Sequence, residues 1–127
     1  MNNDEINKRL KQLNTEDFIW IIYIGIIFLS FLSNSYERKY FIYNDEKSKN
    51  KYRNLNIIIF SILVVVYLYF LKNSINDLKN LNANDSEKKK KLIYFSFIGS
   101  LLISISGFIF LYIAFIDKEL DVELAFN

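Results

Sequence analysis

The sequence predicts an all-α membrane protein with three transmembrane helices in a small helical bundle. Apolar residues make up 52% of the 127 residues, and the charged 24% fall almost wholly between apolar blocks instead of alternating with them. The chain has no Pro and only three Gly, so the residues that usually interrupt helices are nearly absent. Together these features predict a single integral membrane domain over residues 1–127.

The first predicted span covers residues 18–36 and reads FIWIIYIGIIFLSFLSNSY. It has no charge and approaches the roughly 20 residues that a helix needs to cross a bilayer. A cleaved signal peptide is the alternative, with residues 33–35, Ser-Asn-Ser, as the small-residue cleavage site. Because Glu16 and Asp17 stand where such a peptide carries its positive charges, the pattern favours a retained span.

The second and third predicted spans cover residues 54–71 and 92–116. All three spans are apolar around the whole helix and not along one stripe, as a soluble amphipathic helix would be. A soluble bundle with three buried helices is disfavoured because so short a chain leaves little to cover them. Trp and Tyr near the span ends suit the headgroup level: Trp20, Tyr23, Tyr36, Tyr52, Tyr67, Tyr69, Tyr94 and Tyr112.

The segments between the spans also favour helix. Ile6, Leu10 and Leu13 mark one apolar face in the N-terminal tail, which predicts a short amphipathic helix on the membrane surface; a frayed polar tail is the alternative. Asn44 and Asp45 are candidate caps for a second helix that extends past its span on both sides. The next turn is predicted at residues 82–86, NANDS.

Orientation depends on the distribution of Lys and Arg. Lys88, Lys89, Lys90 and Lys91 precede the third span, whereas one Lys follows it, which places the second loop and the N-terminus in the cytoplasm. The first span, with three basic residues before it and six after it, favours the opposite orientation, and a dual topology fits the near balance. The lysine run is interpreted as a topology anchor, or alternatively as a site for anionic lipid headgroups.

No pattern predicts catalysis, a cofactor or a metal. The chain contains no His and no Cys, and none of the three spans contains an ionisable Asp, Glu, Lys or Arg that would indicate a proton relay. Carboxylate pairs such as Asp45 and Glu46 stand in the flanks without a partner motif. No nucleic-acid motif accompanies the basic residues.

One patterned feature is a small-residue face in the third span, which falls within roughly 160° of the helix circumference. Such a face lets helix backbones approach closely and hydroxyls bond across the contact. It is expected to meet the regions of Gly25 and Ser61 or a second copy; a polar pore lining in an oligomer is the alternative. The face consists of Ser96, Gly99, Ser100, Ser104, Ser106, Gly107 and Ala114.

The sequence therefore predicts a small, multi-pass, non-enzymatic component of a bacterial-type cell membrane. Its partners would be the lipid bilayer and either further copies or another membrane subunit, in an accessory, regulatory or structural role. The alternatives are a pore former and a small dual-topology transporter. The size and three spans resemble those of holins, a class that usually carries a basic C-terminal tail; the tail DKELDVELAFN is acidic here.

Overall fold

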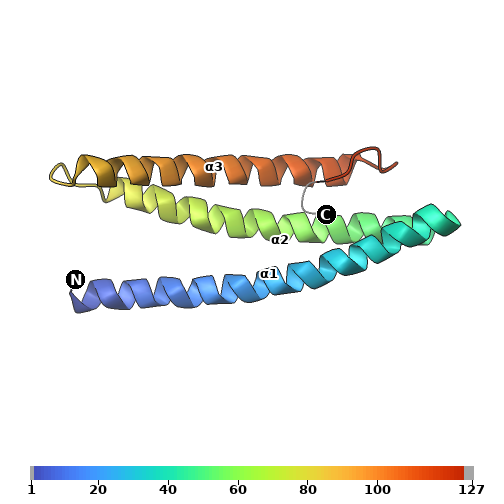
Figure 1. Cartoon of the computed structure of the whole chain (residues 1–127), viewed down its shortest axis with the longest axis horizontal. Coiled ribbons are helices and arrows are strands. Elements are labelled where there is room, and N and C mark those ends of the chain that lie inside the picture. Colours follow the sequence, from blue (N-terminus) through green and yellow to red (C-terminus); the bar gives the residue numbers. More distant parts are fainter. Residues whose placement is uncertain (1, 125–127) are drawn as a thin grey trace.

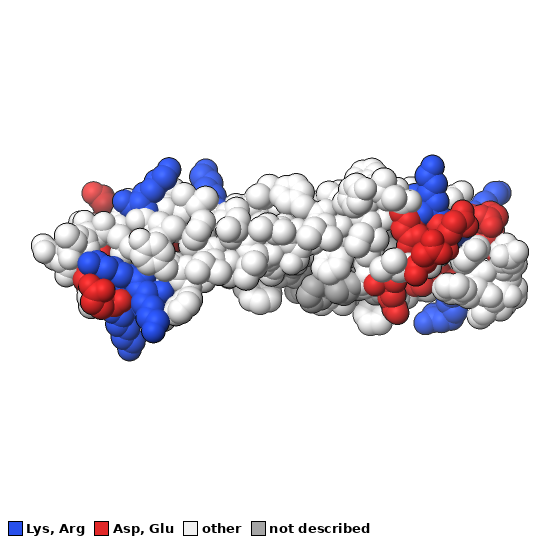
Figure 2. Space-filling model, turned by 90° about the horizontal axis from the view of Figure 1, so that it is seen from above, with Lys and Arg blue, Asp and Glu red and all other residues white. Residues whose placement is uncertain are grey.

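The computed structural model describes residues 2–124 and is all-helical, as the sequence predicts (Figure 1). Its helices are α1 (Asn3–Tyr43), α2 (Glu46–Lys79) and α3 (Glu87–Ile116), and each runs antiparallel to the one before it. All three are long and apolar enough to cross a membrane. On the face shown in Figure 2, the charged residues gather at the two ends of the molecule and leave an uncharged band between them.

Short polar side chains cap the N-termini of the helices. Asn2 forms a capping box with Glu5, Asp45 accepts from the backbone N–H of Lys47, and Ser86 accepts from that of Lys89. Asn44 ends α1 in the left-handed conformation, with a φ of 53°, which Asn tolerates better than most residues. The connection between α1 and α2 therefore needs only two residues.

The sequence analysis expected the N-terminal amphipathic segment to form a separate short helix on the membrane surface. The structure shows no such separate helix among the residues it describes. The segment forms the first turns of α1, whose 41 residues extend about 60 Å, roughly twice the hydrocarbon thickness. No Pro or Gly separates this segment from the apolar stretch, and the Thr15 hydroxyl donates to Lys11 O at 3.1 Å inside an unbroken turn. Helix α2 extends past residues 54–71 on both sides, as expected.

Helix α2 is the centre of the fold. It packs against both α1 and α3, whereas the backbones of α1 and α3 do not approach each other anywhere in residues 2–124. Ile59 and Phe60 of α2 are almost completely buried and join Ile26 of α1 and Ala114 of α3 in one apolar core. Helix α1 diverges from α2 toward the N-terminus, so the separation of these two helices widens into a wedge (Figure 1).

Candidate functional site

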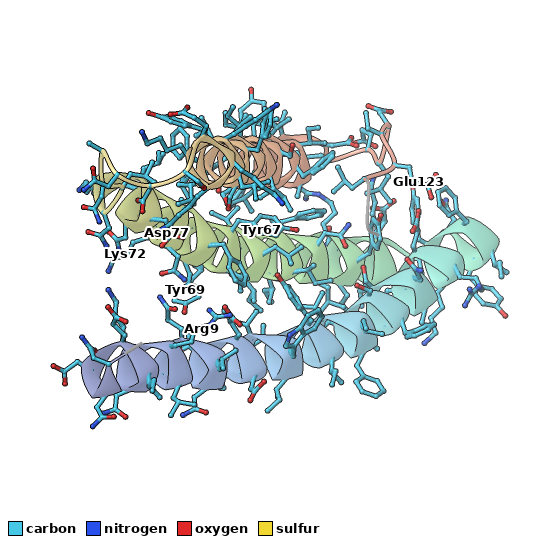
Figure 3. All side chains as sticks on the ribbon, turned by 60° about the vertical axis from the view of Figure 1, so that its left-hand side comes forward. Arg9, Tyr67, Tyr69, Lys72, Asp77 and Glu123 are labelled. Atoms are coloured by element: carbon cyan, nitrogen blue, oxygen red, sulfur yellow. The ribbon has the colours of Figure 1, made fainter. Side chains whose placement is uncertain are left out.

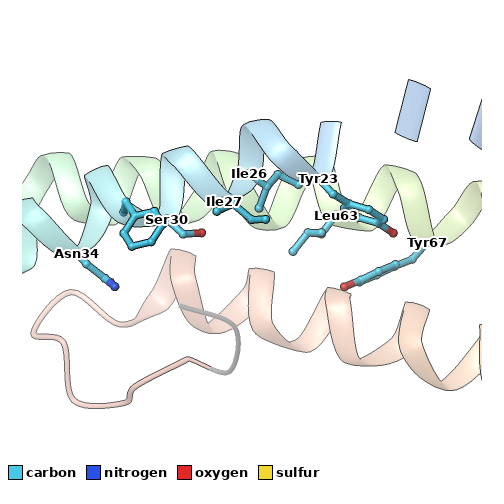
Figure 4. Close-up of a pocket in the computed structure, with 8 residues that line it drawn as sticks. Tyr23, Ile26, Ile27, Ser30, Asn34, Leu63 and Tyr67 are labelled. Atoms are coloured by element: carbon cyan, nitrogen blue, oxygen red, sulfur yellow. The ribbon is translucent and has the colours of Figure 1, made fainter. Parts of the chain in front are cut away.

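The wedge contains a groove with an apolar section at the depth of the predicted spans. This section encloses ≈ 470 Å³ between α1 and α2 and faces α3 (Figure 4). Tyr23 and Tyr67 stand at one end of it, and Asn34 at the other. The lining residues are Tyr23, Ile26, Ile27, Ser30, Phe31, Asn34, Leu63 and Tyr67.

A polar section of the groove lies nearer the N-terminus and is lined by all three helices. It encloses ≈ 300 Å³. Arg9 donates to Gln12 Oε1 at 3.4 Å and lies 3.8 Å from a carboxylate oxygen of Glu16. Figure 3 shows Arg9 of α1 and Asp77 of α2 at the end where the two helices diverge. The lining residues are Arg9, Gln12, Glu16, Phe70, Asn73, Ser74, Asp77, Ser96 and Ser100.

A middle section joins the polar and apolar sections. It encloses ≈ 260 Å³ and shares Glu16 and Phe70 with the polar section and Tyr23 with the apolar one. Ile19 and Trp20 complete its lining. The three sections thus form one groove along α1, whose character changes from charged to apolar with depth.

The sequence analysis missed this groove, although α1 carries a signal for it. Arg9, Glu16, Tyr23 and Ser30 recur every seven residues and therefore lie almost in line along one side of the helix. The apolar residues between them hide this stripe, because the segment is hydrophobic around its whole circumference. A search for polar residues at heptad spacing within an apolar span would have found it.

The structure divides the small-residue face of α3 between two surroundings. Ser104, Gly107 and Ala114 are buried and Ser100 is half-buried, in a 4-3-7 spacing against α2. Ser96, Gly99 and Ser106 are exposed, and of these Ser96 lines the polar section of the groove.

Close helix packing is concentrated at Gly107 and Ser104. A Cβ on Gly107 would lie 2.9 Å from Cδ2 of Tyr67 and 3.3 Å from Cγ2 of Val64. The Ser104 hydroxyl lies 2.8 Å from Ser100 O and 3.3 Å from Tyr67 O, so it donates within α3 and toward α2. The neighbour of this face is therefore the Val64 to Tyr67 turn of α2, and a Cβ on Gly25 would meet nothing within 4 Å.

The opposite end of the bundle holds a buried polar contact between α1 and α2. The Ser33 hydroxyl donates to Asn56 Oδ1 at 2.8 Å, and both side chains are buried. Beyond the predicted spans, burial raises the pKa of Glu37; the hydrogen bond from Tyr52 opposes this shift and the charge of Glu123 adds to it. Polar contacts thus join the ends of α1 and α2 nearest their turn.

The segment after α3 folds back over this polar end as a C-terminal strap, residues 117–124. Leu124 is buried in the core. Lys49 Nζ donates to Glu119 Oε2 at 3.0 Å, and this bond raises the pKa of Lys49. Desolvation would raise the pKa of Asp117, but backbone N–H groups, including those of Asp121 and Val122, lower it overall. Charged and apolar contacts therefore hold the strap in place.

The lysine run lies at the first turn of α3 and makes contacts with residues that are close to it in the sequence. Lys89 pairs with Asp85 at 3.2 Å and Lys90 with Glu87 at 3.5 Å. Backbone N–H donation from Asn82, followed by the Lys89 contact, lowers the pKa of Asp85. Lys91 lies 5.8 Å from the ring centroid of Phe95. The run therefore forms a positive rim beside the polar end of the groove.

Among residues 2–124, no group of three or more Asp or Glu side chains is placed to hold a metal ion. No protein-family model matches the chain, and comparisons with curated proteins and with solved structures return no significant match. The functional argument therefore rests on the geometry of this chain.

Proposed function

We propose that the protein is a non-enzymatic, multi-pass component of a cell membrane that works by associating with other membrane helices, as an oligomer or as an accessory subunit. The observation that carries this proposal is the low coverage of its outer helices. In the most apolar 18-residue stretch of each helix, only 11% of the residues of α1 and 17% of those of α3 are buried within the chain, against 33% for α2. Most of the apolar surface is therefore open to lipid or to partner helices.

Gly99 supplies a place where a partner helix can approach closely. A Cβ at Gly99 would meet nothing within 4 Å, and Ser106, seven residues further along the same side of α3, is exposed. In lipid, helix association depends on close backbone packing at small residues rather than on hydrophobic burial. The exposed part of the small-residue face is thus suited to contacts outside the chain.

The chain has no Cys, so single cysteines can test association directly. Gly99→Cys should form a disulfide-linked species under mild oxidation in native membranes. Leu101→Cys is the matched control, because it lies at nearly the same depth, about 200° around α3. A product of twice the chain mass supports an oligomer, and a heavier mixed product supports an accessory role. Equal or absent cross-linking at both positions would contradict the proposal.

We also propose that the N-terminus and the turn between α2 and α3 lie in the cytoplasm, because Lys88 to Lys91 adjoin that turn. In intact cells, a cysteine at exposed Asn84 should resist a membrane-impermeant thiol reagent, whereas one at exposed Val122 should react. Labelling of both at similar rates would instead indicate dual topology. The reverse pattern would show that the charges around the first span determine orientation.

A further inference from the structure

We propose that the groove between α1 and α2, on the side that faces α3, binds one zwitterionic phospholipid with a primary ammonium headgroup. The headgroup would occupy the polar section and one acyl chain the apolar section. This site is separate from the outer face of α3 invoked above, so a monomeric chain would still bind the lipid.

The depth of the polar section matches that of a headgroup. Glu16 and Asn73 stand just outside the predicted spans 18–36 and 54–71, and Gln12 and Asp77 lie about one turn further out. Headgroups occupy a layer of roughly 5 to 8 Å on each side of the hydrocarbon core. Glu16 and Asn73 are therefore at the level where phosphate and ammonium groups are found, and Gln12 and Asp77, about 9 Å beyond the span ends, are at its outer edge. The backbone at Arg9 lies further out, at about 13 to 14 Å.

The sequence of sections along the groove follows the polarity of a phospholipid molecule. The charged section leads through the one lined by Ile19 and Trp20 into the apolar section beside Leu63. The apolar section, at ≈ 470 Å³, falls within the usual size of ligand cavities. The groove thus changes from charged to apolar in the same order as a phospholipid changes from headgroup to acyl chain.

The charged residues of the polar section indicate which class of headgroup it would bind. The polar section contains the carboxylates of Glu16 and Asp77 and the guanidinium of Arg9, a formal net charge of −1. Arg9 can bind a phosphate, and the two carboxylates can accept hydrogen bonds from an ammonium group. The Arg9 side chain is 55% exposed and that of Glu16 is 29% exposed, so both are accessible from the groove. An anionic headgroup without an ammonium group, such as phosphoglycerol, would place its negative charge near the carboxylates and donate no charged hydrogen bond to them.

The lysines around the rim would favour anionic lipids, and they are the main competitor to this assignment. Lys89 and Lys90 pair with Asp85 and Glu87 beside them, and none of the four lysines of the run lines the groove. None of the four lysines would therefore make a direct contact with a lipid held in the groove.

Native mass spectrometry of the full chain in detergent, with added lipid, tests the inference. Phosphatidylethanolamine should give a single bound lipid with about fivefold higher occupancy than phosphatidylglycerol or phosphatidylcholine. Phosphatidylcholine is informative because its quaternary ammonium has no N–H to donate. Equal occupancy for the three lipids would overturn the inference, and so would preference for phosphatidylglycerol, which would show that the lysine rim dominates.

The double variant Glu16→Gln, Asp77→Asn changes the formal charge of the groove from −1 to +1. Preference should then invert, with phosphatidylglycerol bound about fivefold better than phosphatidylethanolamine. Asp17→Asn is the matched control, because Asp17 is exposed, adjoins Glu16 and does not line the groove. If this control shifts the preference as strongly, net charge alone is responsible and the inference fails.

The apolar section, which would hold the acyl chain, is tested with a separate variant. Ser30→Phe should fill the apolar section and reduce phosphatidylethanolamine occupancy about tenfold, whereas Ile21→Phe, on the opposite side of α1, should leave it unchanged. Ile27→Trp provides a second filling variant if Ser30→Phe lowers the thermal midpoint of the protein. Unchanged occupancy in a folded filling variant would show that no acyl chain enters the groove and would overturn the inference.

Discussion

Gly107→Leu should lower the thermal midpoint of the protein in mild detergent by several degrees. The new Cβ would lie 2.9 Å from Cδ2 of Tyr67, so either the Tyr67 ring must turn toward the groove or α3 must move away from α2. Overpacking of this kind costs about 1 to 3 kcal/mol. Displacement of α3 would also lengthen the 3.3 Å contact between the Ser104 hydroxyl and Tyr67 O.

Gly99→Leu is the matched control for this prediction. It introduces the same side chain into the same helix and gains the same helix propensity, but a Cβ at Gly99 meets nothing within 4 Å. Its thermal midpoint as a monomer should equal or exceed that of the unaltered chain. A similar loss of stability in both variants would contradict the packing of α3 on α2 described above.

Leu124→Asp should release the C-terminal strap. Leu124 is buried beside Ile59, Phe60 and Ala114, where an unpaired carboxylate cannot be hydrated. The contact between Lys49 and Glu119 cannot hold the strap in place by itself. The Glu119 side chain is 73% exposed, and an ion pair with an exposed partner contributes little to stability. We expect the strap to leave its site while α1, α2 and α3 remain helical.

Release can be measured with Ala114→Cys, since Ala114 is buried and the chain has no other thiol. Thiol labelling should be slow with the unaltered strap and at least tenfold faster with Leu124→Asp. Val122→Asp is the control, because Val122 is 53% exposed and its substitution should leave the labelling rate unchanged. Unchanged labelling in Leu124→Asp would mean that the strap does not protect Ala114.

The lengths of the three charge-free segments were enough to predict an all-helical fold and the positions of its apolar stretches. A long apolar segment without Pro has few alternatives to a helix. Helix length was less predictable. The boundary expected before Phe18 does not exist, since polar residues with adequate helix propensity continue α1 without a break. The strap was not predicted at all, because the burial of Leu124 depends on tertiary contacts that no local pattern encodes.

Residue size alone also could not assign the faces of α3. Ser104 and Gly107 contact α2, but Ser106 and Gly99 of the same predicted arc are exposed. Phe110, a large residue within that arc, packs with its ring centroid 5.7 Å from that of Phe60. The arc spans about 160°, which is wider than one helix contact, so the position of the neighbouring helix decides which small residues are used.

The central position of α2 has a consequence for the order of folding. Helix contacts join only elements adjacent along the chain, so each helical hairpin can form as soon as its second helix has been synthesised. Such a topology has low contact order and requires no search for distant partners among the helices. The strap is the exception, because Leu124 joins the same core as Ile26, about 100 residues earlier in the chain. Docking of the strap must therefore wait until residue 124 has been synthesised.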